Sequence, residues 1–166
     1  AKKYPEMLLV EYDNDWPSEC YTSPGNTGDK VDWQPVKRSG LANFSDLEKA
    51  LEMKIHQDVI SYYSAYWSDN LIAETDKGHL QLLQPLNQHD FEQLQQNLVG
   101  HILMKRRLKQ PETLFIGLTD EDDFILTVDN MSGKVMLEQV GLLPKEVVAP
   151  NLAVFIQSLK PSYISA

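Results

Sequence analysis

The chain of 166 residues has the length of one domain, and at 19.0 kDa it can bury a sizeable core without metals or disulfides. Hydrophobic residues make up 42% and charged residues 23%, which excludes disordered and fibrous classes. The formal net charge of −9 argues against nucleic acid as a partner, because phosphates would repel the protein, and favours a basic partner. We predict a single domain over residues 1–166.

Cysteine content and the N-terminal residues indicate the compartment. Cys20 is the only cysteine, so no internal disulfide forms, which fits a reducing environment. Residues 1–6 lack the apolar stretch of an export signal, and no apolar run is long enough to span a membrane.

The first half of the chain mixes short strands and helices. Residues 23–28 predict a loop, and residues 31–36 predict a strand anchored by Trp33, with Pro35 favouring an edge position. Residues 59–67 predict a second helix, and two strands follow, at residues 71–72 and 80–83, around a turn at 76–78. The first helix, which precedes these elements, is predicted to begin with a cap at Asn43 or Ser45. Its apolar face consists of Phe44, Leu47, Leu51 and Ile55.

The clearest helix runs over residues 88–109. Asn87 is its expected N-cap, with Asp90 three residues later in a capping box. Its inner stripe is expected to comprise Phe91, Leu94, Leu98 and Ile102, widened by Val99 and Leu103. The C-terminal end carries Lys105, Arg106, Arg107 and Lys109, which the helix dipole favours; contact with acidic lipid or RNA is the alternative reading.

The last third predicts a meander followed by a helix. Strands are expected at residues 113–118, 124–128 and 134–140, and the short turns at 120–123 and 130–133 imply antiparallel pairing. A final helix is predicted from Pro150, with one face formed by Leu152, Phe155, Ile156 and Leu159. The order of elements indicates the α+β class.

No catalytic, cofactor or metal motif is recognisable. The four histidines are scattered, and His101 beside the apolar stripe is interpreted as structural. The segment from His89 to Glu92 is interpreted as a polar first turn of the helix, and residues 120–123 lack the pattern of a calcium loop. We therefore expect a protein that is not an enzyme and that binds no cofactor, although a hydrolase using two carboxylates remains an alternative.

Acidic residues gather in two expected loops. Residues 1–76 carry a balance of −7 and residues 77–166 one of −2, and the densest later run is 120–123. Such runs are either solvated surface or a dock for a basic segment. The residues that we expect to bind a basic protein partner are Glu11, Asp13, Asp15, Glu121, Asp122 and Asp123.

Several stretches of the sequence form a recognisable set: Val31-Asp32-Trp33-Gln34-Pro35, residues 91–109 with Asn97-Leu98-Val99-Gly100-His101 and Lys105-Arg106-Arg107-Leu108-Lys109, Thr113-Leu114-Phe115-Ile116, Asn130-Met131-Ser132-Gly133 and residues 151–161. Together, and over the chain from about Tyr4, they resemble the Syd family of SecY-interacting proteins.

The resemblance implies a mostly antiparallel sheet flanked by helices, related to SMI1/KNR4-type domains. It also implies a non-enzymatic, peripheral protein on the cytoplasmic side of the inner membrane, with a cytoplasmic pool. An acidic concave surface would bind the basic cytosolic loops of the SecY channel, in quality control of abnormal translocon complexes. The helix that usually begins the family is expected to be absent. An immunity or scaffold protein of the SMI1/KNR4 type that binds a basic partner is the alternative.

Overall fold

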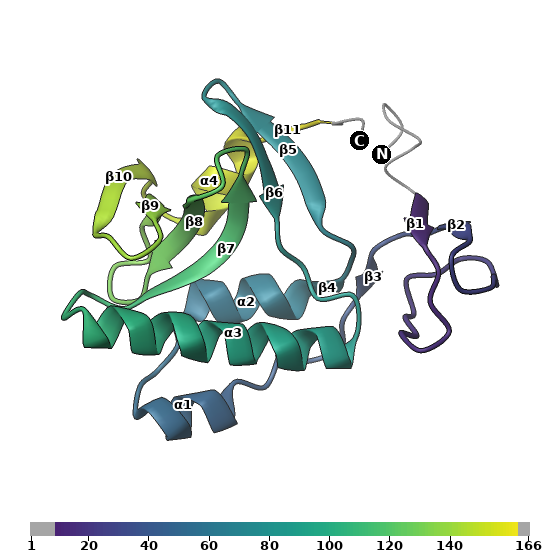
Figure 1. The fold of residues 1–166 in the computed structure, drawn as a ribbon, viewed down its shortest axis with the longest axis horizontal. Coiled ribbons are helices and arrows are strands. Elements are labelled where there is room, and N and C mark those ends of the chain that lie inside the picture. Colours follow the sequence, from purple (N-terminus) through teal and green to yellow (C-terminus); the bar gives the residue numbers. More distant parts are fainter. Residues whose placement is uncertain (1–8, 163–166) are drawn as a thin grey trace.

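The computed structural model describes residues 9–162, and its centre is one antiparallel sheet in the order β10-β9-β8-β7-β6-β5-β11 (Figure 1). Its strands are β5 (Leu71–Thr75), β6 (Gly78–Leu82), β7 (Thr113–Thr119), β8 (Phe124–Asp129), β9 (Val135–Gln139), β10 (Pro144–Ala149) and β11 (Lys160–Pro161). The strands and turns expected from residue 71 to residue 139 are confirmed. The predicted absence of an export signal at residues 1–6 lies outside the described residues.

Helix α3 (Gln88–Arg107) runs along one face of the sheet, with α1 (Ser45–Leu51) beyond it (Figure 1). Helix α2 (Gln57–Ala65) is tied to the sheet by the Tyr63 hydroxyl, which donates to the Phe115 carbonyl of β7 at 2.8 Å. His101 of α3 packs edge-on against Phe115 of β7, with ring centroids 5.8 Å apart. On the opposite face, α4 (Leu152–Ser158) contacts β10 and places Phe155 beside Leu126 and Leu137. The sheet is therefore covered by helices on both faces.

Local signals explain where the helices begin. The Asn87 side chain accepts a hydrogen bond from Asp90 N at 2.8 Å, which confirms it as the cap of α3. The Asp90 carboxylate in turn accepts from Leu86 N at 2.8 Å, one residue earlier than a standard capping box. At α4 the cap is Asn151, and Pro150 lies outside the helix rather than in its first turn.

In the N-terminal half of the chain, three predicted elements differ from the structure. The strand expected over residues 31–36 is divided into β2 (Lys30–Asp32) and β3 (Val36–Lys37), because Pro35 has no N–H to donate to a ladder. Strand β2 pairs with β1 (Leu9–Glu11), and β3 pairs with β4 (Tyr66–Trp67). The helix expected at residues 59–67 therefore ends before Tyr66, because its last two residues form β4. Helix α1 ends at Leu51, yet Ile55 remains buried.

The inner face of α3 is only partly the predicted one. Phe91, Leu98 and Ile102 are buried, and Leu94 and Val99 are packed against the core. The prediction that Leu103 widens the inner face is wrong, because 49% of the surface of Leu103 is exposed. Lys105, predicted among the dipole-favoured cations, is instead fully buried, as the next subsection describes.

Candidate docking site

The acidic turn at 120–123 forms part of the rim of a cleft of about 360 Å³. The cleft lies on the α4 face of the sheet, where the β5–β6 and β7–β8 turns meet. Its floor is apolar and includes Phe124, Leu126, Leu137 and Phe155. The rim carries the carboxylates of Asp76, Asp120 and Glu121 together with Lys77, His79 and Lys145. The cleft thus combines an apolar floor with a charged edge.

Hydrogen bonds hold the acidic turn in one shape. Thr119 Oγ1 accepts from Glu121 N at 3.2 Å, and Phe124 N donates to Glu121 O at 3.0 Å. Val140 N donates to Asp123 O at 2.9 Å, which fixes the far side of the turn to the end of β9. Asp120, Glu121, Asp122 and Asp123 are all exposed. The structure therefore displays four carboxylates on a well-held turn.

Gly78 allows the two turns to approach each other. Its φ of +135° is a conformation that side chains disfavour, and a Cβ at this position would lie 3.4 Å from Asp120 Oδ2. The carboxylate of Asp120 thus lies directly beside the β5–β6 turn that carries Asp76. Asp76 was not among the predicted site residues, because the two turns are more than 40 residues apart in the chain.

Of the two lysines at the rim, one is already paired. Lys77 Nζ lies 2.8 Å from Glu146 Oε2, and this bond lowers the pKa of the Glu146 carboxyl. Lys145 Nζ lies 5.1 Å from the centre of the Phe124 ring. A ligand at the rim therefore meets Asp76, Asp120 and Glu121 with Lys145 as the remaining cation, and a basic group would be favoured there.

The other predicted acids lie in a separate part of the molecule. Glu11 ends β1 of the two-stranded sheet, far from the β7–β8 turn (Figure 1). Asp13 Oδ1 accepts from Asp15 N at 2.9 Å and so shapes its own loop. Glu11 and Asp15 are exposed, and Asp13 is half-buried. The six predicted residues thus lie in two separate clusters, within the part of the chain that the structure describes.

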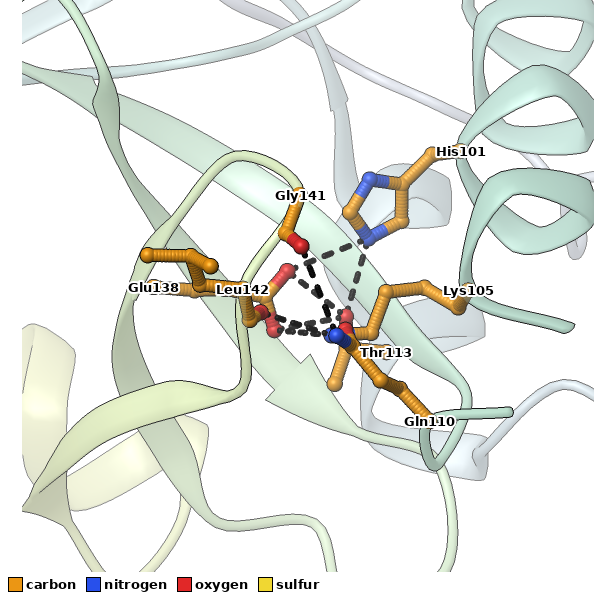
Figure 2. Close-up of polar contacts among 7 residues, drawn as sticks. All are labelled: His101, Lys105, Gln110, Thr113, Glu138, Gly141 and Leu142. Carbon is orange, nitrogen blue, oxygen red and sulfur yellow. Dashed lines mark hydrogen bonds and ion pairs between the residues drawn. The ribbon is translucent and has the colours of Figure 1, made fainter. Parts of the chain in front are cut away.

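A buried polar cluster joins the C-terminal end of α3 to the sheet (Figure 2). Lys105 Nζ donates to Gln110 Oε1 at 2.7 Å, to Glu138 Oε1 at 3.2 Å and to the Leu142 carbonyl at 3.2 Å. Thr113 Oγ1 lies 3.1 Å from Glu138 Oε1 and 2.9 Å from His101 Nε2. A neutral His101 that donates from Nε2 to Thr113, which donates to Glu138, satisfies all three groups.

Burial shifts the pKa values of the ionisable groups in this cluster. Burial, aided by the charge of Lys105, lowers the pKa of His101 to about 4, so the imidazole is neutral at pH 7. Burial also raises the pKa of Glu138, and the adjacent Lys105 opposes that shift. Lys105 and Glu138 side chains have no exposed surface, so no solute reaches them. The cluster is therefore a packing element, which agrees with the structural reading of His101.

Two carboxyl groups with a raised pKa in one pocket would favour the hydrolase hypothesis, and residues 9–162 do not bring two such groups together. The pKa is raised by burial at Asp69 and at Glu138. The charged neighbour of Asp69 is Asp90, whereas that of Glu138 is Lys105, so the two do not share a site. Residues 9–162 also bring together no cluster of His, Cys, Asp or Glu suited to a metal ion.

A second groove, of about 970 Å³, lies between α2 and α4. Its lining is mostly apolar, with Tyr62, Tyr66, Leu71 and Ile156, and Asp58 is its one carboxylate. This groove does not include any of the six predicted acids.

Cys20 is buried in a small N-terminal core beside Trp33 and Leu86. Burial raises the pKa of its thiol, which disfavours the reactive thiolate. Within residues 9–162, no helix is both long enough and apolar enough to cross a bilayer.

Comparison with known proteins identifies the family. A family model described as Syd protein (SUKH-2) matches residues 1–161. The chain is 55% identical over 164 residues to Protein Syd of Pseudoalteromonas atlantica, which covers 98% of this chain and 88% of that protein. It is 50% identical over 156 residues to Protein Syd of Alteromonas mediterranea, covering 94% and 86%.

The fold agrees with this match. Residues 9–162 form four helices around a seven-stranded antiparallel sheet, which confirms the predicted sheet flanked by helices of the SMI1/KNR4 type. The resemblance noted from the sequence is likewise confirmed: the chain belongs to the Syd family.

Proposed function

We propose that the protein is a non-enzymatic adaptor that binds the cytosolic loops of the SecY channel through acidic side chains. It would act peripherally at the cytoplasmic face of the inner membrane, exchange with a cytoplasmic pool, and serve in quality control of abnormal translocon complexes. Membership of the Syd family supports this proposal, because SecY binding is what the family resemblance implies.

The observation that carries the proposal is the cleft between the β5–β6 and β7–β8 turns. Asp76, Asp120 and Glu121 surround an apolar floor, and Asp122 and Asp123 extend the acidic edge. Cytosolic loops of membrane proteins are enriched in Lys and Arg. A basic loop that places a cation at this rim and an apolar side chain on the floor would match both features.

The net charge of −9 supports the same partner chemistry, since it increases the rate of encounter with a basic surface. The cluster of Glu11, Asp13 and Asp15 is proposed as a second contact. Because it lies on a separate part of the molecule, it would meet a different loop or a different part of the partner.

Co-purification from detergent-solubilised membranes tests the proposal. The tagged protein should retain SecY as its main partner. A variant in which Glu121, Asp122 and Asp123 are changed to Lys should retain much less. Recovery of a basic soluble protein in place of SecY would favour the alternative, an immunity or scaffold role of the SMI1/KNR4 type.

A further inference from the structure

The turn between β9 and β10 exposes apolar side chains that a turn seldom presents to water. The exposed fractions are 51% for Val140, 54% for Leu142 and 60% for Leu143. Gly141 between them has a φ of +85°, which lets the chain reverse tightly at this point. Clusters of exposed apolar side chains with polar neighbours indicate an interaction surface.

The backbone of this turn is held by the C-terminal end of α3. Lys105 Nζ donates to the Leu142 carbonyl at 3.2 Å, and Gln110 Nε2 donates to the Gly141 carbonyl at 3.4 Å (Figure 2). Lys105 is itself held by Glu138 inside the protein. The turn and the helix end therefore form one surface although they lie more than 30 residues apart.

The helix end contributes positive charge to this surface. Arg106 is committed to Glu112 at 2.6 Å and to the Leu51 carbonyl at 2.7 Å, and Lys105 is buried. Arg107 and Lys109 are exposed, and within residues 9–162 neither forms an ion pair. Leu108 between them is 45% exposed and adds to the apolar area.

Lys109 occupies a backbone position that favours glycine. Its φ is +56°, and the chain reverses there through bonds from Lys109 N to Arg106 O and from Gln110 N to Lys105 O. A left-handed conformation is unfavourable for a residue with a Cβ. The protein thus keeps a lysine where glycine would fold more easily, and such strain is concentrated at functional sites.

We propose that this surface, Arg107, Leu108, Lys109, Val140, Leu142 and Leu143, binds the headgroup region of an anionic lipid bilayer. Leu142 and Leu143 would enter the boundary between headgroups and acyl chains, and Arg107 and Lys109 would pair with lipid phosphates. Interfacial binding depends on this combination of buried apolar area and attraction between basic side chains and anionic lipid. The long stems of Arg and Lys let the charge remain among the headgroups while the leucines are buried.

The acidity of the whole protein does not prevent this contact. At physiological salt the Debye length is about 8 Å, so charges on distant parts of the molecule are screened and nearby ones dominate. The acidic turn adjoins one side of the surface, through Val140 N and Asp123 O. The carboxylates of this turn lie within a Debye length of Val140 and so oppose the contact on that side, whereas Arg107 and Lys109 would favour it on the helix side.

Flotation with protein-free vesicles tests the proposal without SecY. The full chain should float with vesicles of phosphatidylcholine and phosphatidylglycerol, and much less with phosphatidylcholine alone. Lys109→Gly should weaken binding by about fivefold, since one cation near an anionic surface contributes about 1 kcal/mol. Its melting temperature should stay the same or rise, because glycine suits the backbone. Leu142→Ser with Leu143→Ser should weaken binding more than tenfold.

Matched variants serve as controls. Glu52→Gly removes a charged residue at the other non-glycine position of residues 9–162 that has a positive φ, and Leu41→Ser removes a leucine that is 71% exposed elsewhere. Both should bind vesicles like the unmodified protein. Changing Glu121, Asp122 and Asp123 to Lys should strengthen vesicle binding while it weakens binding to SecY, which separates this surface from the proposed acidic dock.

Three results would overturn the proposal. The first is that the unmodified protein does not float with anionic vesicles. The second is that the Lys109 and leucine variants float unchanged. The third is that the leucine variant loses binding only to vesicles that contain SecY, which would assign the surface to a protein partner.

Discussion

Lys105 of α3 and Glu138 of β9 form an ion pair in which neither side chain is exposed, with Nζ 3.2 Å from Oε1. The pair joins the C-terminal end of the longest helix to the sheet, and Thr113 and His101 complete its hydrogen bonds. Removing one partner of such a pair leaves an uncompensated charge inside the protein, whereas replacing both by apolar residues avoids it.

Lys105→Met is therefore expected to destabilise the protein by about 3–5 kcal/mol. The double variant Lys105→Met with Glu138→Leu should recover most of that loss. Denaturant unfolding measures both. Lys54→Met is the control, because Lys54 is 90% exposed and lies 4.0 Å from Glu48, and it should change stability little. Equal stability of Lys105→Met and the unmodified protein would show that the pair is not formed in solution.

The lowered pKa of His101 predicts how the stability of the protein depends on pH. Its pKa is about 4 when folded and about 6.5 when unfolded, so the unfolded chain binds more protons between these values. The free energy of unfolding therefore includes the full contribution of neutral His101 above pH 6.5. It decreases by up to about 3 kcal/mol as the pH falls from 6.5 toward 4.

Unfolding of the unmodified protein and of His101→Gln should be compared across this range. The difference isolates His101 from other groups, including Glu138, whose raised pKa acts in the opposite direction. The unmodified protein should lose more stability than the variant between pH 6.5 and pH 4. Parallel curves for the two proteins would contradict a buried neutral His101.

Leu98 and Leu103 provide a matched pair on α3, since Leu98 is fully buried and Leu103 is 49% exposed. Leu98→Ala should cost about 2–5 kcal/mol, because it removes a core side chain and leaves a cavity. Leu103→Ala should cost less than about 0.5 kcal/mol. Thermal or denaturant unfolding checks both, and similar losses for the two variants would mean that the helix face is wrongly assigned.

The sequence predicts those elements whose signals are local. Helix α3 follows from the spacing of Phe91, Leu98 and Ile102 and the cap at Asn87, and the strands β5 to β9 follow from short apolar runs divided by clear turns. Strand β10 was missed because it begins at Pro144 and exposes Lys145, Glu146 and Val147, as an edge strand does.

Contacts between distant segments lie beyond such patterns. Lys105 has the sequence context of an exposed cation at a helix end, and only the folding of β9 against α3 brings Glu138 to it. In the same way, Asp76 joins Asp120 only because two hairpin turns meet at Gly78. The acidic turn itself was predictable, but its partner residues in the cleft were not.

Attachment to membranes that contain SecY should depend on salt if acidic side chains provide the contact. Raising the salt from about 0.15 M to 1 M shortens the Debye length from about 8 Å to about 3 Å. A wash at high salt should therefore release most of the bound protein, measured by its division between supernatant and pellet. Complete retention after the wash would argue against electrostatic docking.

The most direct test of the acidic dock is the affinity for purified SecY of two triple variants, each measured together with a melting curve. One changes Glu121, Asp122 and Asp123 to Lys, and the other changes Glu11, Asp13 and Asp15 to Lys. A single exposed ion pair contributes only about 0.2–1 kcal/mol, but three reversals remove three attractions and add three repulsions. We expect the variant of the 120–123 turn to bind more than tenfold more weakly, a loss of at least about 1.4 kcal/mol, with its melting temperature maintained. If both variants remain folded and bind SecY with unchanged affinity, the acidic dock is contradicted.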